Sequence, residues 1–259
     1  MGPLHGIGVL VTRPEQQAMP LCRLLEAQGA STLRLPAIDI KACGDMGEAR
    51  ARIGALDGFA LIIFTSANAV RFGHTLLERR GDLTLAAIGP ATARALSECE
   101  YDVTVRPPQG FNSEALLADI RLQDLTAQRV LLIKGADGRP MLEQELIRRG
   151  AEVMAVDVYQ RIPASPSARD LAKVQAELTA GRLQVVTATS LDVGRRLLEA
   201  VSPELRLQLQ RAHWLVPGER VAAALRDYGL HAPVLQAASA EDQDLVKALL
   251  RWRTAAPCA

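Results

Sequence analysis

Residue types and patterns that point to several common functions are scarce or missing in this chain of 259 residues. It has only two Trp, three Tyr and four Phe, and 30 Lys and Arg nearly balance 29 Asp and Glu, leaving a net charge of +1. This balance argues against a basic nucleic-acid surface and a disordered acidic tail. No apolar run approaches the roughly 18 residues of a membrane span, and no signal-peptide pattern opens the chain. We therefore expect a cytoplasmic protein that binds neither nucleic acid nor membranes.

Cysteine and histidine are also few, and their spacing fits no metal site. The four cysteines and four histidines are scattered, without the C-x-x-C pairs or the i, i+4 histidines of zinc proteins. A disulfide framework is not expected in a cytoplasmic chain of this size. The glycine-rich motifs that bind nucleotide phosphates and the G-x-S-x-G motif of hydrolases are missing as well. The sequence therefore predicts a protein that works without a metal, a dinucleotide or a Ser-His-Asp triad.

Short apolar segments alternate with amphipathic ones along the chain. The runs at 7–12, 59–64 and 130–134 have the pattern of strands buried on both faces, and helical segments such as 14–28 and 67–80 follow them. Strands alternating with helices predict an α/β fold with parallel sheets. The further predicted strands are 31–35, 84–88, 102–106, 152–158, 185–189, 213–216 and 232–236, and the further predicted helices are 90–98, one beginning at 113, 139–149, 192–200, 220–227 and 241–253.

The alternation is organised as an internal repeat. Residues 9–35 align without gaps with residues 130–156, at an offset of 121, so that VLVTRP lies over VLLIKG. The matching segments, first copy before second, are 9–35 and 130–156, 60–70 and 184–194, and 85–96 and 213–225. The chain therefore contains two copies of one α/β unit of roughly 120 residues, each long enough to bury its own core.

The domain boundary need not fall between the two copies. Extended, proline-containing segments occur at equivalent places, at 33–41 and 153–164. If both cross side by side between two lobes, lobe two comprises residues 38–161 and lobe one is assembled from 1–37 and 162–259. We therefore expect two similar doubly wound, flavodoxin-like lobes with a cleft and a two-stranded hinge, lobe one being discontinuous.

The segments after the predicted strands share a chemistry that suits anions. Ligands of parallel α/β sheets bind beyond the carboxyl ends of the strands, where this chain has small hydroxyl residues, glycines and a few cations at helix starts. Helix N-termini present free N–H groups and a positive dipole end, which favour anions. The candidate residues are Thr12, Arg13, Thr65, Ser66, Ala67, Gly89, Lys134, Gly135, Thr189, Ser190, Gly218 and Arg220.

Each of these residues also has a purely structural interpretation. Ser66 and Ser190 could be helix N-caps, worth about 1 kcal/mol each, and Ser113 is expected to cap the helix that follows it. Gly89 and Gly218 could only allow tight turns, and the cations could be solvated loop charges. The residues alone leave both interpretations open.

Eight short motifs follow one another along the chain. They are VTRP (11–14), FTSANAV (64–70), AIGPATARAL (87–96), FNSEALL (111–117), LLIKGADGRPML (131–142), VYQR (158–161), TATS (187–190) and PGERVAAAL (217–225). In this order and spacing they resemble the uroporphyrinogen-III synthase family, over residues 7–250. The resemblance implies two α/β lobes joined by a two-stranded ladder, with the first lobe discontinuous.

The resemblance also implies an activity. Members of the family are lyases that close hydroxymethylbilane, a linear octacarboxylate tetrapyrrole, into uroporphyrinogen III without a cofactor, in haem, sirohaem and cobalamin biosynthesis. Loss of the terminal hydroxyl leaves an azafulvene cation, which attacks ring D to give a spiro-pyrrolenine, and rearrangement inverts that ring. The substrate cyclises unaided to the wrong isomer, so the protein chiefly fixes the geometry of ring closure. The implied partners are this small molecule and, transiently, neighbouring enzymes of the pathway.

Particular residues take roles from the resemblance. Tyr159 matches the tyrosine of the family's hinge motif, which is thought to protonate the departing hydroxyl; the structural alternative is a packed aromatic with its hydroxyl at the surface. Arg13, Lys134 and Arg220 would neutralise carboxylates. The residues implied to bind carboxylates through N–H groups and hydroxyls are Ser66, Ala67, Gly89, Ser113, Ser190 and Gly218.

One loop departs from the family pattern. Family members often have a hydroxyl residue shortly after the glycine of the last loop, where this chain has Val221; the first copy keeps Thr92. Glu219 in the same loop could repel an anion. The role of this loop therefore stays open.

A second class of function is compatible with the same pattern. Two α/β lobes with a hinged cleft also describe a cytoplasmic protein that binds a small anion as a sensor, without chemistry. Such a sensor usually has an attached output domain, for which 259 residues leave no room. We therefore expect an enzyme, and a monomer because no heptad repeat or self-association stripe is present.

Overall fold

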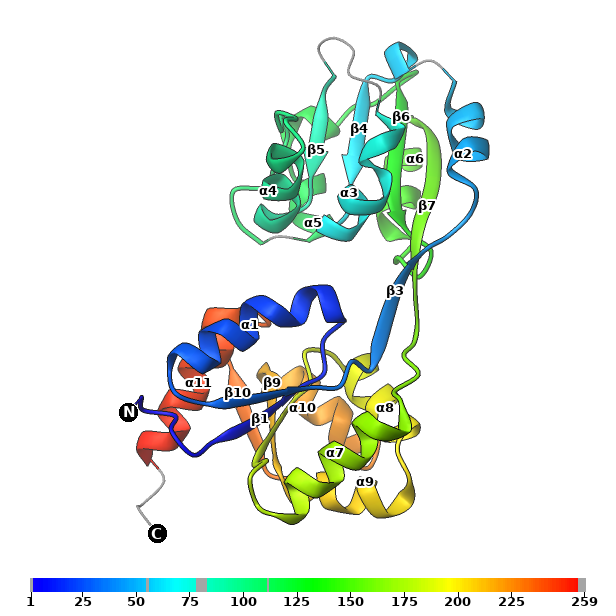
Figure 1. Cartoon of the computed structure of the whole chain (residues 1–259). Coiled ribbons are helices and arrows are strands. Elements are labelled where there is room, and N and C mark those ends of the chain that lie inside the picture. The colour runs from blue at the N-terminus through cyan, green and yellow to red at the C-terminus, as the bar shows by residue number, and fades with distance from the viewer. Residues whose placement is uncertain (1, 55, 78–82, 111, 256–259) are drawn as a thin grey trace. The chain divides into compact units, whose positions relative to one another are not determined.

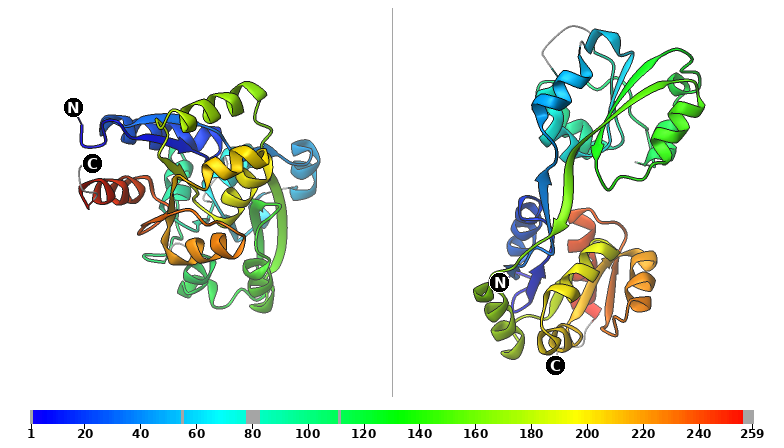
Figure 2. Two further views of the ribbon diagram at one scale, coloured as in Figure 1. Left: turned by 90° about the horizontal axis from the view of Figure 1, so that it is seen from below. Right: turned by 90° about the vertical axis from the view of Figure 1, so that its right-hand side faces the viewer.

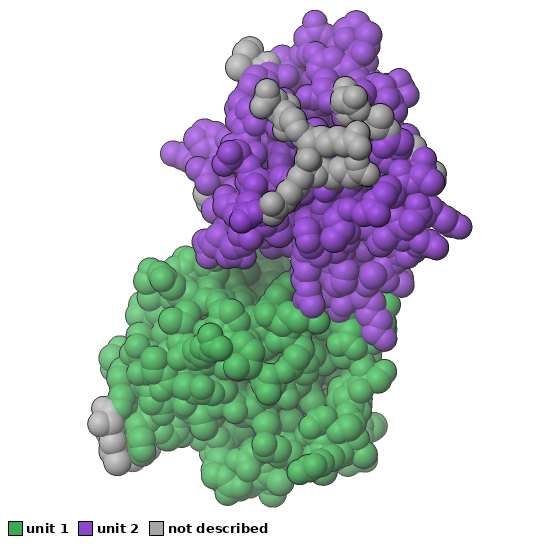
Figure 3. All heavy atoms as spheres, turned by 45° about the horizontal axis from the view of Figure 1, so that its top comes forward, with its two compact units in different colours: residues 1–39, 162–259 green, residues 40–161 purple. Residues whose placement is uncertain are grey.

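The computed structural model describes residues 2–54, 56–77, 83–110 and 112–255, and the chain divides into two units (Figure 3). Unit 1 comprises Met1–Asp39 and Ile162–Ala259, and unit 2 comprises Ile40–Arg161. The chain therefore passes between the units at 39–40 and at 161–162. The sequence pattern predicted these passages at 37–38 and at 161–162.

Unit 1 contains a parallel sheet in the order β10-β9-β8-β1-β2, with helices on both faces (Figures 1 and 2). Its strands are β1 (Gly8–Val11), β2 (Ser31–Arg34), β8 (Val185–Thr187), β9 (His213–Pro217) and β10 (Val234–Ala237). Its helices are α1 (Glu15–Ala27), α7 (Ala168–Thr179), α8 (Leu191–Ala200), α9 (Pro203–Leu209), α10 (Gly218–Asp227) and α11 (Asp242–Ala255).

The core of unit 1 lies on both faces of this sheet, because alternate strand residues point to opposite faces. Val9 and Val11 pack with α1 and α11 on one face, whereas Leu10 and Trp214 pack with α8 and α10 on the other. A strand buried in this way needs an apolar side chain at every position. The uninterrupted apolar run of β1 is therefore explained.

Unit 2 contains a sheet in the order β3-β7-β6-β4-β5. Its strands are β3 (Ile38–Ala42), β4 (Leu61–Phe64), β5 (Leu85–Ala87), β6 (Arg129–Gly135) and β7 (Glu152–Pro163). The helices α2 (Met46–Ile53), α3 (Ala67–Gly73) and α4 (Pro90–Glu98) pack on one face, and α5 (Ser113–Leu117) and α6 (Met141–Arg148) on the other. The pairs β7–β6, β6–β4 and β4–β5 are parallel.

β3 lies beside the long strand β7 at one edge of the sheet of unit 2 (Figures 1 and 2). The N–H of Cys43 donates to Val158 O at 3.2 Å, and the N–H of Ala164 donates to Ala37 O at 3.1 Å. Residue numbers fall along one segment as they rise along the other, so the two run antiparallel. Both passages between the units lie within this pair of segments.

The two sheets share an order of equivalent strands. Across the sheet, β2-β1-β8-β9 of unit 1 corresponds to β7-β6-β4-β5 of unit 2. The segments that align at the offset of 121 pair β1 with β6 and β2 with β7. The other matching segments of the repeat pair β8 with β4 and β9 with β5. The order along the chain differs, because in unit 2 the equivalents of β8 and β9, which are β4 and β5, come before the equivalents of β1 and β2, which are β6 and β7.

Some predicted elements are wrong in extent or missing. The predicted strand at 102–106 is a single bridge from Val105 to Ala86, since Pro107 and Pro108 follow and have no N–H to extend the ladder. The predicted helix at 67–80 ends as an α-helix at Gly73 and continues as the 3₁₀ turn η2 (His74–Leu76); residues 78–80 and Gly81 lie outside the described residues. The helices that the pattern missed are α2, α7 and α9. Among the described helices, none has the length and apolar content to cross a membrane.

Candidate functional site

A pocket of about 330 Å³ opens in unit 2 beyond the carboxyl ends of β4 and β6. Parallel strands bring the segments that follow them to one edge of the sheet, which is where ligands of such folds bind. The predicted site residues that line this pocket are Thr65, Ser66, Ser113, Lys134, Gly135 and Tyr159. Residues from four separate parts of the sequence are thus brought together as expected for a shared site.

An irregularity in strand pairing turns Tyr159 toward this pocket. Along β6 and β7, Lys134 pairs with Asp157, but the next residue, Gly135, pairs with Tyr159, so Val158 is the extra residue of a bulge. Val158 and Tyr159 are consecutive, yet both are buried in the same core cluster, which regular alternation would not allow. β-Bulges commonly redirect side chains beside functional sites.

The hydroxyl of Tyr159 lies between two polar groups. Its Oη is 3.1 Å from Ser66 Oγ and 3.4 Å from Nη2 of Arg161. The ring is stacked with Phe72, with 6.0 Å between centroids, and the residue is only 3% exposed. Tyr159 is therefore a packed aromatic, as the structural alternative held, but its hydroxyl belongs to a hydrogen-bonded group at a pocket and not to open surface.

Gly135 makes room for the Tyr159 ring. A Cβ at this position would lie 2.6 Å from Tyr159 Cζ and 2.9 Å from its Oη. Carbon atoms do not approach so closely without one of them moving. A side chain at residue 135 is therefore incompatible with the observed position of the ring.

Ser66 and Ser190 occupy equivalent positions in the two units. Ser66 Oγ accepts from the N–H of Ala69 at 3.1 Å, and Ser190 Oγ accepts from the N–H of Val193 at 3.3 Å. Both serines are N-caps, of α3 and α8, which confirms their structural interpretation. Ser66 has an additional contact, since it also reaches Tyr159.

Replacing either serine by alanine is expected to lower the free energy of unfolding by about 1 kcal/mol, because each change removes one cap hydrogen bond. Only Ser66→Ala should also alter the environment of Tyr159. Denaturant titration measures the first effect, and tyrosine NMR signals measure the second. Ser190→Ala is the matched control, and an equal change of the Tyr159 signal in both variants would contradict the assignment.

The prediction that Ser113 caps its helix is wrong. Asn112 is the N-cap of α5, and its side-chain oxygen accepts from the N–H of Ala115 at 2.8 Å. Ser113 is the first residue of that helix and lines the pocket. Asn competes well with Ser as a cap, and the cap was assigned one residue too late.

The three predicted cations have different surroundings. Arg13 forms an ion pair with Asp242 and donates to the carbonyl of Ala240. Lys134 Nζ lies 2.9 Å from Asp157 Oδ1. Arg220 is exposed, and within the described residues no hydrogen bond or ion pair involves its guanidinium. The charges of Arg13 and Lys134 are thus partly neutralised, whereas that of Arg220 is not.

Further predicted residues lie at the carboxyl edges of the two sheets. Thr12 is fully buried, and its hydroxyl donates to Thr187 O between β1 and β8, so it serves strand pairing. Thr189 is half-buried before the cap of α8. Gly218 has a φ of +75°, which favours glycine, at the start of α10. Ala67 begins α3, and Gly89 is the N-cap of α4 in extended conformation.

Several pocket residues were not predicted from the sequence. Those with polar or charged side chains are Asn112, Asp137, Arg139 and Arg161. Arg161 was within the quoted VYQR motif, two residues after Tyr159 on the same strand, and that spacing places both on one side of the strand. The strand spacing was the signal that could have identified it.

Metal-ligating and redox groups are dispersed in the described part of the chain. There, no three His, Cys, Asp or Glu side chains are grouped to bind a metal ion. Cys22, Cys43 and Cys99 are free thiols, and Cys258 lies outside the described residues. Burial raises the pKa of the Cys22 thiol and that of the Cys43 thiol above the usual value for cysteine.

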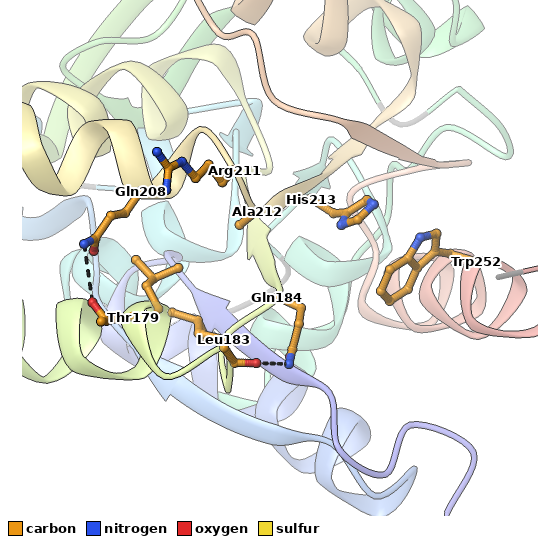
Figure 4. A pocket seen from close by; sticks show the side chains of 10 residues that line it. Thr179, Leu183, Gln184, Gln208, Arg211, Ala212, His213 and Trp252 are labelled. Atoms are coloured by element: carbon orange, nitrogen blue, oxygen red, sulfur yellow. Dashed lines mark hydrogen bonds between the residues drawn. The ribbon is translucent and has the colours of Figure 1, made fainter. Parts of the chain in front are cut away.

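A second pocket, of about 450 Å³, lies in unit 1 at the amino ends of β8 and β9. Figure 4 shows Thr179 and Gln208 at one end of it and His213 and Trp252 at the other. None of the predicted site residues lines it, and it lies at the edge of the sheet opposite to that where ligands of such folds bind. We therefore place the candidate site in the pocket beside Tyr159.

His213 is expected to make the free energy of unfolding depend on pH. The centroids of the His213 and Trp252 rings are 4.7 Å apart, and burial lowers the pKa of His213 below its usual value. The unfolded chain therefore binds a proton more readily than the folded one, so the free energy of unfolding should fall as the pH drops below about 6.5. His213→Gln should reduce this fall, measured by denaturant titration between pH 5 and 8. An unchanged pH dependence would contradict the expectation.

Known proteins are similar to this chain in sequence and in structure. The family model for uroporphyrinogen-III synthase HemD matches residues 20–247. Uroporphyrinogen-III synthase of Chlorobaculum parvum is 30% identical over 237 residues, covering 88% of this chain and 92% of that protein. The synthase of Salmonella typhimurium is 30% identical over 255 residues, covering 94% and 100%.

Two solved structures share the fold. A mutant uroporphyrinogen III synthase of Thermus thermophilus aligns with a TM-score of 0.60 at 21% identity, covering 95% of this chain and 98% of that one. Uroporphyrinogen-III synthetase of Helicobacter pylori aligns with a TM-score of 0.59 at 14% identity, covering 95% and 99%. At such identities the likeness shows a common mixed α/β fold with two largely parallel sheets.

Proposed function

Because the chain belongs to the uroporphyrinogen-III synthase family and has its synthase function, we propose that it closes hydroxymethylbilane to uroporphyrinogen III through the spiro-pyrrolenine route. The observation that supports this chemistry is the hydroxyl of Tyr159 at the pocket of unit 2. A phenol is both a donor and an acceptor. It can therefore give a proton to a leaving hydroxyl and later take one back.

The first step is loss of water from the substrate. Tyr159 donates its proton to the terminal hydroxyl, the C–O bond breaks, and water departs from the azafulvene cation. The phenolate oxygen that remains faces Ser66 and Arg161. Closure to the macrocycle releases one proton, which restores the phenol, so that the sum of the steps is loss of one water.

Binding and orientation of the substrate are the larger task. The pocket presents Lys134 and Arg139 with the hydroxyls of Thr65 and Ser113, donors of the kind that bind carboxylates. Fixed carboxylates would hold ring D where the azafulvene carbon can attack its substituted position. Such orientation accelerates one closure geometry over the others.

We extend the proposal to the architecture of the enzyme. Units 1 and 2 would be the two similar flavodoxin-like lobes, and β3 with β7 the two-stranded hinge, since both passages of the chain lie in these segments. The enzyme would be a cytoplasmic, monomeric, cyclising lyase that needs no cofactor and that contacts neighbouring pathway enzymes transiently.

Product analysis tests the function directly. The protein is mixed with freshly generated hydroxymethylbilane, the products are oxidised, and the type I and type III isomers are separated. Type III product is expected, against type I alone from a heat-denatured control. Only type I product with the native protein would contradict the proposal, and binding of hydroxymethylbilane without turnover would favour the small-anion sensor.

A further inference from the structure

We infer that Arg161 is a positioning residue, which directs the proton of Tyr159 into the pocket and stabilises the phenolate after the proton has left. The inference rests on the proposed role of Tyr159 as proton donor. It concerns a residue whose side chain contacts the phenol and not the reacting bond.

The placement of Arg161 follows from its strand. Arg161 and Tyr159 are two residues apart on β7, so their side chains lie on one side of it. The guanidinium carbon lies 5.7 Å from the centre of the Tyr159 ring, and Nη2 lies 3.4 Å from Oη. The backbone N–H of Arg161 donates to Asp137 Oδ2 at 3.1 Å, which fixes the strand at this point.

The charge of Arg161 is available to the phenol. Within the described ranges no ion pair involves its guanidinium, in contrast to Arg139, which pairs with Glu114 at 3.4 Å, and Lys134, which pairs with Asp157. A guanidinium donates hydrogen bonds and accepts none. Its contact with Oη therefore always uses a lone pair of the phenol oxygen.

Ser66 supplies the second donor to the same oxygen. Because Ser66 Oγ accepts from the N–H of Ala69 at 3.1 Å, its own proton is free to point toward Tyr159 Oη. A phenol oxygen has one proton and two lone pairs. With Arg161 and Ser66 on the lone pairs, the proton of Tyr159 has no partner among the described residues and points to the pocket.

The same two donors act after the transfer. Hydrogen bonds to an ionised oxygen are stronger than those to a neutral one, so both become stronger when the phenolate forms. The ring itself is held by stacking on Phe72 and by the space above Gly135. Arg161 is exposed and is not needed for that packing, so its effect should appear in the rate rather than in stability.

The decisive variants are Arg161→Met, which removes the charge, and Arg161→Lys, which keeps it. Arg161→Met should lower kcat for uroporphyrinogen III formation about tenfold, move the alkaline limb of the rate profile to higher pH and leave the unfolding midpoint unchanged. Arg161→Lys should restore most of the rate. In a Tyr159→Phe background, Arg161→Met should not lower kcat any further. Arg139→Met, in the same pocket, should not move the alkaline limb.

A measurement that does not depend on turnover separates the inference about Arg161 from the proposed role of Tyr159 as proton donor. The chain has only three tyrosines, so Cζ-labelled protein gives three carbon NMR signals, assigned by Tyr→Phe variants. Arg161→Met should shift the Tyr159 signal alone. An unshifted signal, or an equal loss of rate in both backgrounds, overturns the inference about Arg161 while the synthase chemistry stands. Full activity of Tyr159→Phe overturns the proton-donor role, and the inference with it.

Discussion

Tyr159→Phe is expected to lower the rate of uroporphyrinogen III formation by about ten- to a hundredfold, near the lower range of general acid catalysis. The substituted ring can still stack on Phe72 and fill the space above Gly135, so the fold and substrate binding should be kept. What is lost is the proton delivered to the leaving hydroxyl. Initial rates with freshly generated hydroxymethylbilane measure the effect on kcat, which should fall while KM changes little.

The other two tyrosines provide matched controls for this variant. Tyr101 donates to Leu77 O at 3.0 Å, and Tyr228 donates to Glu199 Oε1 at 2.7 Å; neither lines the pocket beside Tyr159. Tyr101→Phe and Tyr228→Phe should therefore keep the normal rate. Equal losses in all three variants would mean that the phenol at position 159 has no special part in the reaction.

The fold was predictable to the extent that local patterns determine it. The apolar runs of β1, β4 and β6 are buried on both faces of a sheet, and such runs have few alternatives. The segment at 102–106 alternates polar and apolar residues as a half-buried strand does, yet the prolines after it limit its pairing to one bridge. Sequence patterning detects a strand's burial but not how far its partner extends.

The site was predictable in its location and less so in its roles. The strand ends placed Ser66 and Lys134 at sheet edges, whereas Tyr159 was assigned to the hinge and took its role from the family resemblance. The bulge that turns Tyr159 depends on register between β6 and β7, and the ion pair of Arg13 depends on Asp242, 229 residues away. Such tertiary partners leave no trace in local spacing.

Gly135→Ala is expected to reduce activity at least as much as Tyr159→Phe and to lower the free energy of unfolding by about 1–3 kcal/mol, as overpacking does. The added methyl would lie 2.6 Å from Tyr159 Cζ, so the ring must move. Since Ser66 and Arg161 hold the hydroxyl only at its present position, such movement separates Oη from both donors. Rates per folded molecule and denaturant titration measure the two effects.

Gly194→Ala is the control for Gly135→Ala, because a Cβ at Gly194 would lie 2.5 Å from Cδ2 of Leu225 in the core of unit 1, and Gly194 does not line the pocket beside Tyr159. It should lose stability without losing rate per folded molecule. If Gly135→Ala behaved in the same way, the ring of Tyr159 could shift without consequence for the reaction. A loss of rate confined to Gly135→Ala would instead mean that catalysis depends on where the hydroxyl is held, since both variants add a methyl group in close contact with a buried side chain.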